Sequence, residues 1–137
     1  MILFDTNVWS ALRKPRGQQH VVNWISERMD QAFLSVIVIA EIRMGVEDPK
    51  ASAKRDELEQ WLEDLQILCT ERILDFDTRS AHIFGTLIAR RKLQKQETKL
   101  LDLQLAAQAI AYDLEFATGN VKDFEWTGVK VINPWDA

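Results

Sequence analysis

The sequence predicts an α/β fold in which a short parallel sheet is covered on both faces by helices. Short apolar runs alternate along the chain with segments of helical periodicity, as in folds built from repeated strand–helix–strand units. The first run, ILF at residues 2–4, is continuously apolar, as a strand buried on both faces requires. The predicted strands cover residues 2–4, 32–36, 72–77, 114–120 and 129–134.

Six helices are predicted between these strands. The first begins near Asn7 and ends near Pro15 and Gly17, which interrupt helices, and residues 19–30 form the second. A short third helix over residues 37–46 is expected to be closed by Gly45. The remaining three helices are predicted over residues 52–68, 79–94 and 99–113.

The segment 52–68 is the clearest amphipathic helix. Its apolar stripe is formed by Leu58, Trp61, Leu62 and Leu65. Periodicity also places most of the tryptophans in the core. The five are Trp9, Trp24, Trp61, Trp126 and Trp135.

Length and composition favour one domain over residues 1–137. The chain is 47% hydrophobic, which is enough for a core without disulfides. Its single cysteine, Cys69, has no partner for an internal disulfide, so a reducing, cytoplasmic compartment is expected. No apolar run reaches the roughly 18 residues of a membrane span, and no charged signal-peptide region is apparent.

The net charge of -4 argues against broad, non-specific nucleic-acid binding, which favours a basic protein. It is compatible with an enzyme whose acids gather in one metal site. Two histidines and one cysteine offer little basis for a zinc site of the Cys/His type. We therefore expect any metal ion to be held by oxygen ligands.

Four acids occupy unusual positions. Asp5 directly follows the first strand, where ligands bind in parallel sheets. Glu41 and Asp102 each lie on an apolar stripe of a predicted helix, where an unpaired charge is costly. Asp123 follows the fourth strand, close behind Thr118 and Asn120.

Each acid also has a purely structural interpretation. Asp5 can cap the helix that follows it, and Asp102 can be an N-cap as well. Glu41 can pair with a buried arginine, although Arg43 points elsewhere on a helix. Asp123 can be an ordinary turn residue. For each acid except Glu41, taken singly, the structural interpretation is favoured.

Taken together, the four acids favour a metal site. Carboxylates that converge on one crevice repel one another unless protons or a cation neutralise them. Mg²⁺ and Mn²⁺ prefer such oxygen ligands, and a common use of these ions is hydrolysis of phosphodiesters.

Four segments resemble the PIN-domain ribonucleases, and within them the VapC/FitB-like toxins of type II toxin–antitoxin pairs. They are MILFDTNVWS (1–10), LSVIVIAEIRMGV (34–46), LDLQLAAQAIAYDLEFATGNVKDF (101–124) and GVKVINPW (128–135). The resemblance covers nearly the whole chain in the family's order. It implies a PIN-like three-layer α/β/α sandwich with a short central parallel sheet, and metal-dependent cleavage of RNA.

The resemblance also implies roles for individual residues. Asp5 and Asp102 match the principal ligands of Mg²⁺ or Mn²⁺, and Glu41 and Asp123 complete the cluster, partly through water. The polar positions that match supporting residues are Thr6, Asn7, Thr118 and Asn120. The implied partners are an RNA substrate, a second copy of the chain in a homodimer, and a small antitoxin that blocks the site. Operator DNA is implied only indirectly, through the antitoxin.

Two departures from the family pattern affect substrate contacts more than the four acids. Family members often carry Arg before the Asn of T-x-N, where this chain has Gly119. The segment before the third acid often contains Gly and Pro, whereas KLQKQETKLLD (92–102) has neither.

A basic stretch lies just before that acid. It can guide an RNA backbone, or it can be a solvated helix end, and the two interpretations are equally supported. Its residues are Arg90, Arg91, Lys92, Lys95 and Lys99. RKPRG at residues 13–17 presents the same choice, with the solvated end favoured.

Two other functions remain open. One is a catalytically inactive PIN-like binding module, against which the presence of all four acids argues. The other is a Mg²⁺-dependent aspartyl phosphatase, which needs a second acid where this chain has Asn7.

Overall fold

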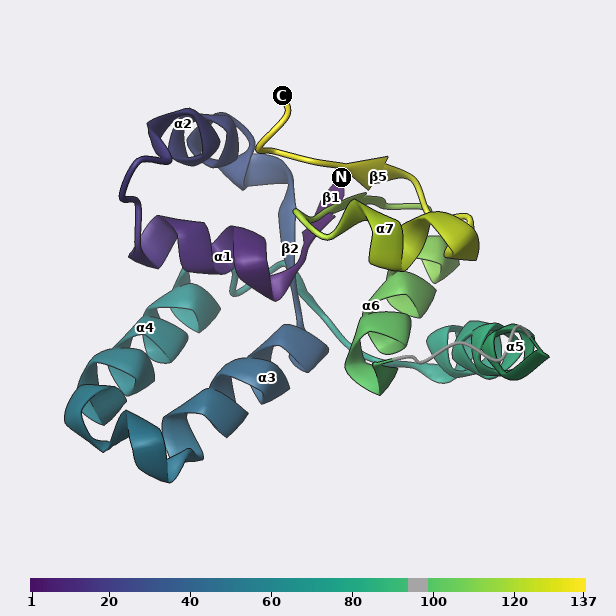
Figure 1. The fold of residues 1–137 in the computed structure, drawn as a ribbon, viewed down its shortest axis with the longest axis horizontal. Helices are drawn as coiled ribbons and strands as arrows, with labels where there is room; N and C mark the ends of the chain where they lie inside the picture. The colour runs from purple at the N-terminus through teal and green to yellow at the C-terminus, as the bar shows by residue number, and fades with distance from the viewer. Residues whose placement is uncertain (94–98) are drawn as a thin grey trace.

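The computed structural model contains one five-stranded sheet with the order β3-β2-β1-β4-β5 (Figure 1). It describes residues 1–93 and 99–137. Every neighbouring pair of strands is parallel, which confirms the predicted sheet. The strands are β1 (Ile2–Phe4), β2 (Ala32–Ser35), β3 (Ile73–Leu74), β4 (Glu115–Ala117) and β5 (Val131–Ile132).

All six predicted helices are present. They are α1 (Thr6–Arg13), α2 (Gln19–Glu27), α3 (Val36–Glu47), α4 (Arg55–Leu68), α5 (Thr78–Leu93) and α6 (Leu100–Ala111). A further short helix, α7 (Val121–Phe124), follows β4 and was not predicted. Three 3₁₀ turns complete the chain: η1 (Met29–Gln31), η2 (Pro49–Lys54) and η3 (Glu125–Thr127).

The helices form two layers with the sheet between them. From β1 to β3 the chain moves along the sheet in one direction, and from β3 to β5 it returns and continues in the other. Right-handed crossovers then place α1–α4 on one face and α5–α7 on the other. Figure 1 shows these two groups on opposite sides of β1 and β2. The fold is therefore the expected α/β/α sandwich.

The chain changes direction at β1, which pairs with β2 on one side and β4 on the other. Leu3 is level with Phe33 of β2 and with Phe116 of β4. In parallel sheets such a switch point leaves a crevice at the carboxyl ends of the strands. Asp5 lies at that edge, and its backbone N–H donates to the carbonyl of Ala117 at 2.9 Å.

Aromatic side chains fill the core beside β1. Phe4 and Trp9 are fully buried, and their ring centroids are 4.9 Å apart. Trp24 is buried next to them, as predicted. The other three tryptophans, Trp61, Trp126 and Trp135, are partly exposed and pack against the core.

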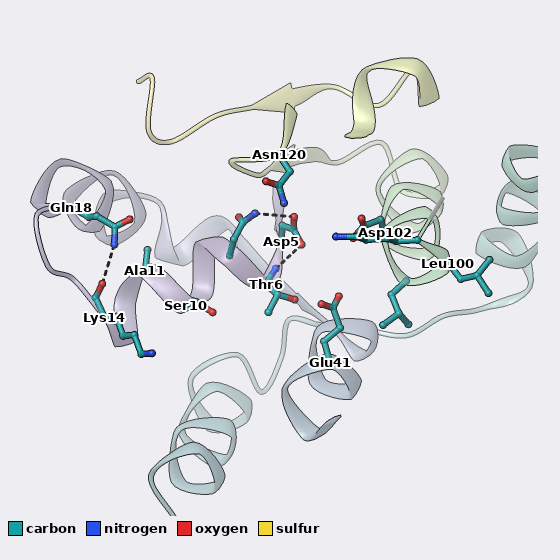
Figure 2. Close-up of a pocket in the computed structure, with 13 residues that line it drawn as sticks. Asp5, Thr6, Ser10, Ala11, Lys14, Gln18, Glu41, Leu100, Asp102 and Asn120 are labelled. Atoms are coloured by element: carbon teal, nitrogen blue, oxygen red, sulfur yellow. Dashed lines mark hydrogen bonds between the residues drawn. The ribbon is translucent and has the colours of Figure 1, made fainter. Parts of the chain in front are cut away.

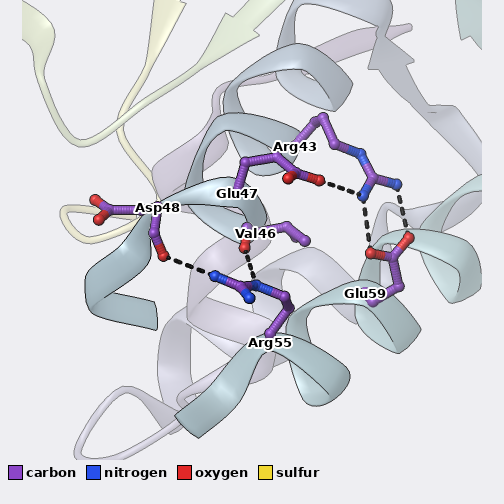
Figure 3. A network of polar contacts seen from close by, with 6 residues as sticks. All are labelled: Arg43, Val46, Glu47, Asp48, Arg55 and Glu59. Carbon is purple, nitrogen blue, oxygen red and sulfur yellow. Dashed lines mark hydrogen bonds and ion pairs between the residues drawn. The ribbon is translucent and has the colours of Figure 1, made fainter. Parts of the chain in front are cut away.

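Ion pairs and hydrogen bonds join α3 to α4 (Figure 3). Both terminal nitrogens of Arg43 contact Glu59, at 2.8 and 2.7 Å. Arg55 donates to the Val46 carbonyl at 2.8 Å and so satisfies a group at the end of α3. The prediction that Gly45 closes this helix was wrong, because the carbonyl groups beyond it find partners on α4.

A buried polar network connects α3, β3 and α6. Ser35 caps α3 by accepting from the N–H of Ile37 at 2.9 Å, and its hydroxyl donates to the Gln108 side chain on α6. The Gln108 amide donates to the carbonyls of Leu74 and Asp75, at 3.2 and 3.1 Å. Ser35 and Gln108 are both fully buried, so these bonds replace lost hydration.

Within residues 1–93 and 99–137, no helix has the length and apolarity needed to cross a membrane.

We predict that Gln108→Leu destabilises the fold by about 1–3 kcal/mol, because the buried Ser35 hydroxyl loses the acceptor for its proton and the part-buried carbonyls of Leu74 and Asp75 lose an amide donor. Urea unfolding measures this change in the free energy of unfolding. The matched control is Gln60→Leu on the exposed face of α4, whose amide donates to the exposed Asp64, and it should change stability by less than about 0.5 kcal/mol. Equal losses for the two variants would contradict a structural role for the network.

Candidate metal centre

Three of the four predicted acids meet at the carboxyl edge of the sheet (Figure 2). Asp5 follows β1, Glu41 lies in the middle of α3, and Asp102 lies in the first turn of α6. One carboxylate oxygen from each lies within 4.8 Å of the other two. Helices from both layers and the central strand thus bring together residues that are far apart in the sequence.

Asp5 is held rigidly by hydrogen bonds to both of its carboxylate oxygens. Oδ1 accepts from the N–H of Thr6 at 2.7 Å, and Oδ2 accepts from the hydroxyl of Thr118 at 2.7 Å. The first bond caps α1, which confirms the structural interpretation of Asp5, and the position of its carboxylate beside Glu41 and Asp102 is compatible with a metal site. Burial raises the pKa of Asp5, and these two hydrogen bonds oppose the shift.

The other predicted supporting residues surround Asp5. The Asn7 amide lies 3.4 Å from Asp5 Oδ2 and 3.3 Å from the Thr118 hydroxyl, and its oxygen accepts from the N–H of Gly119. The N–H of Asn120 donates to Thr118 at 3.0 Å, and its side chain lines the cavity. Loop 118–120 and the start of α1 are therefore joined around this carboxylate.

Glu41 is the second acid of the group. Its Oε1 is buried without a hydrogen bond among the described residues. The Thr6 hydroxyl is near enough to lower its pKa, although no hydrogen bond of standard geometry joins the two groups. Arg43 pairs with Glu59 instead. Burial, followed by repulsion from Asp5 and Asp102, raises the pKa of Glu41 to about 7.

Asp102 is not the N-cap of α6, because Lys99 occupies that position. Asp102 is the third residue of α6. Among the residues that the structure describes, its carboxylate has no hydrogen-bond partner. Burial, followed by repulsion from Asp5, raises its pKa to about 6, while the nearby charge of Lys99 acts in the opposite direction.

Asp123 lies outside this group of three. It is exposed in the first turn of α7 and lines a neighbouring hollow that shares Asn120 with the main cavity. Its charge is still close enough to raise the pKa values of Asp5 and Asp102. Three of the four predicted acids therefore lie together, and the fourth, Asp123, affects Asp5 and Asp102 through the electrostatic effect of its charge.

The carboxylates open into a cavity of about 840 Å³ that extends along one face of α1 (Figure 2). Sequence reasoning missed the far end of this cavity, where Ser10, Lys14 and Gln18 line the wall. The signal was present, since Asn7, Ser10 and Lys14 have the spacing of one helical face. Leu100 and Leu101 form an apolar wall on the opposite side.

The residues predicted to contact RNA lie in different parts of the structure. Arg90 and Arg91 lie over the ring of Trp126, at 5.9 and 4.9 Å from its centroid, and Arg90 donates to the Trp126 carbonyl. Lys99 lines the cavity. Lys95 and the side chain of Lys92 lie outside what the structure describes.

Packing against Trp135 explains why this chain has Gly119 where family members often carry Arg. A Cβ at this position would lie 3.1 and 3.2 Å from two ring carbons of Trp135. The Trp135 ring is held by a 2.8 Å bond from its N–H to Gln18. Any larger residue at 119 therefore requires this ring to shift.

The model of the PIN domain family matches residues 2–127. The chain belongs to the PIN domain family. Its sequence is 33% identical to the VapC ribonuclease Y4jK of Sinorhizobium fredii, over 99% of each chain. The crystal structure of FitAcB from Neisseria gonorrhoeae is similar to it, with a TM-score of 0.85, 34% identity and full coverage of both chains. A toxin-antitoxin complex from Klebsiella pneumoniae is similar too, with a TM-score of 0.68, 28% identity and 98% coverage of both chains.

The donor set of this PIN domain fits a divalent cation. Three carboxylates from Asp5, Glu41 and Asp102 converge, and the buried Glu41 Oε1 lacks a partner that a cation would supply. Hard divalent cations prefer such all-oxygen sites. Bound in this place, the ion would offset the burial and the carboxylate repulsion that raise the pKa values of Glu41 and Asp102.

We predict that the metal-free PIN domain loses stability as pH rises from about 5 to about 8. The folded-state pKa values of Glu41 (about 7) and Asp102 (about 6) exceed the ordinary values of 4.5 and 3.8. The folded protein therefore binds more protons than the unfolded chain in this range, and the stabilisation present at low pH is lost through about pH 6–7.

Thermal melts in EDTA across this pH range measure the effect. Glu41→Gln should reduce the fall in Tm, whereas Glu63→Gln, an exposed acid on α4, should leave it unchanged. A Tm that is independent of pH in the unmodified protein would contradict the proposed protonation of the cluster.

Proposed function

We propose that this PIN domain is a metal-dependent endoribonuclease toxin that a cognate antitoxin neutralises. The observation that carries the proposal is the group of three carboxylates within 4.8 Å at the carboxyl edge of the sheet. It occurs in a chain that aligns along 99% of its length with a VapC ribonuclease. The PIN family match, residues 2–127, contains all four acids of the proposed site.

In this proposal Asp5, Glu41 and Asp102 hold Mg²⁺ or Mn²⁺, and Asp123 contributes through water from α7. When bound, the ion supplies an activated water and a positive charge on the scissile phosphate. Asp5 provides the most rigid ligand, because hydrogen bonds from Thr6 and Thr118 fix its carboxylate. This rigidity limits reorganisation when charge develops in the transition state.

Glu41 has a separate role in orienting the attacking water. Its Oε1 has no hydrogen bond among the described residues, so it can accept one from that water. A bound cation would favour the ionised form of Glu41, which is the form that accepts a hydrogen bond. Asn120 supports the opposite wall of the cavity, where it can donate to a substrate phosphate.

The proposed partners follow from the family. The similar Klebsiella pneumoniae structure is a toxin-antitoxin complex, which supports an antitoxin as a partner of this chain. We extend the proposal to a homodimer, and to operator DNA bound only through the antitoxin, in agreement with the acidic balance of the chain. The cytoplasm is the proposed compartment, because the single cysteine, Cys69, is free and buried.

The aspartyl phosphatase alternative has no structural support. Such enzymes need a second acid two residues after the nucleophile, and here the Asn7 side chain is directed to Asp5 and Thr118. The inactive binding module is less favoured than the nuclease, because a module without catalysis has no need for three mutually repelling carboxylates.

We predict that Asp102→Asn lowers RNA cleavage at least about 100-fold, because it removes one charge from the cation site. The assay uses antitoxin-free protein with mixed single-stranded and structured RNAs, in Mg²⁺ or Mn²⁺ and in EDTA. Asp30→Asn, an exposed acid in η1, is the matched control and should cleave like the unmodified protein.

The circular dichroism spectra of both variants should match that of the unmodified chain. Cleavage that persists in EDTA, or that is equal in Asp102→Asn, would refute the assignment of the site.

A further inference from the structure

A second hollow adjoins the cavity and shares Lys14 with it. It has a volume of about 420 Å³ and lies where the end of α1 meets the start of α4. We call it the basic hollow. Its lining residues are Arg13, Lys14, Pro15, Arg16, Lys54 and Glu57.

The basic hollow has a charge opposite to that of the whole chain. Four basic side chains face one acid, which leaves an excess of three positive charges (4 − 1), whereas the complete chain carries -4. Glu57 is engaged by Arg13, with nitrogen and oxygen 3.8 Å apart. Arg13 also lies over the ring of Trp61, so its position is defined by the protein itself.

The other three cations have no such partners. Among residues 1–93 and 99–137, no ion pair or side-chain hydrogen bond is formed by Lys14, Arg16 or Lys54. All three side chains belong to exposed residues. Unpaired cations grouped in a concave surface favour the binding of an anion of extended shape.

We propose that the basic hollow binds backbone phosphates of the RNA strand whose scissile phosphate lies at the carboxylates. This inference rests on the proposed ribonuclease function and adds the path of the substrate. Lys14 joins the two regions, because it lines both the cavity and the basic hollow. From Asn7 to Lys14, α1 rises about 10 Å, which is the axial length of about three stacked nucleotides.

The composition of the basic hollow favours RNA over an acidic protein segment. Protein interfaces depend on buried apolar and aromatic anchors, and Pro15 is the only apolar residue in the lining that the structure describes. Phosphate binding requires only exposed cations. The basic hollow is also continuous with the catalytic cavity, which favours RNA as its ligand. An RNA strand that enters the cavity must leave it across the adjoining surface.

The test measures the affinity of a fluorescent single-stranded RNA for antitoxin-free protein in EDTA, where no cleavage occurs. Each phosphate contact contributes about 0.7 to the slope of log affinity against log salt, or about fivefold in affinity at 0.1 M relative to 1 M salt. Lys14→Gln should therefore weaken binding about fivefold. Lys14→Gln/Arg16→Gln/Lys54→Gln should weaken it about 100-fold and lower the slope by about 2.

The matched control is Lys130→Gln, which removes an exposed lysine next to β5 that pairs with the exposed Asp113. The RNA affinity of this variant should be unchanged. Steady-state cleavage with Mn²⁺ should show that Lys14→Gln raises KM and leaves kcat nearly constant. Thermal melts check that all variants are folded.

Unchanged RNA affinity in the folded triple variant would overturn the proposed path while leaving the ribonuclease proposal intact. Unchanged RNA affinity together with lost binding of the purified cognate antitoxin would also overturn the path, and would assign the basic hollow to a protein interface. Failure of the unmodified chain to bind or cleave any RNA would overturn both proposals together.

Discussion

Repulsion among three partly buried carboxylates is the constraint on which the arrangement of the site depends. Oxygens of Asp5, Glu41 and Asp102 lie within 4.8 Å of one another, and burial raises the pKa of each acid. Three negative charges at this separation repel one another, so the side chains move apart unless the fold holds them in place. Strand β1, the first turns of α1 and α6, and the Ser35–Gln108 network hold the three side chains in place. A divalent cation or protons neutralise their charge.

The supporting structure divides this task between the two layers of helices. Asp5 is fixed locally, by the end of β1 and by hydrogen bonds from Thr6 and Thr118. Glu41 and Asp102 are carried on α3 and α6, which belong to different layers and which the buried bond between Ser35 and Gln108 connects. The spacing of the carboxylates therefore depends on contacts six residues away from each acid along its helix.

The sequence predicted the sheet, the six main helices and a cluster of four acids, of which three converge, because each of these leaves a local pattern. An apolar run that ends in Asp5, and a charge on an apolar helical stripe, can both be read without coordinates. The Ser35–Gln108 bond joins residues 73 positions apart, and no local pattern reveals such a pair. The contact of Gly119 with Trp135 and the basic hollow also depend on tertiary packing, so residues 13–17 looked like a solvated helix end.

The most direct test of the central claim is a crystal structure of the antitoxin-free chain soaked with Mn²⁺ and measured for anomalous scattering. We expect one strong anomalous peak between the carboxylates of Asp5, Glu41 and Asp102, at about 2.0–2.3 Å from at least two of them. A crystal in which Mn²⁺ binds elsewhere, or in which these three carboxylates contact only one another and protein donors, would contradict it.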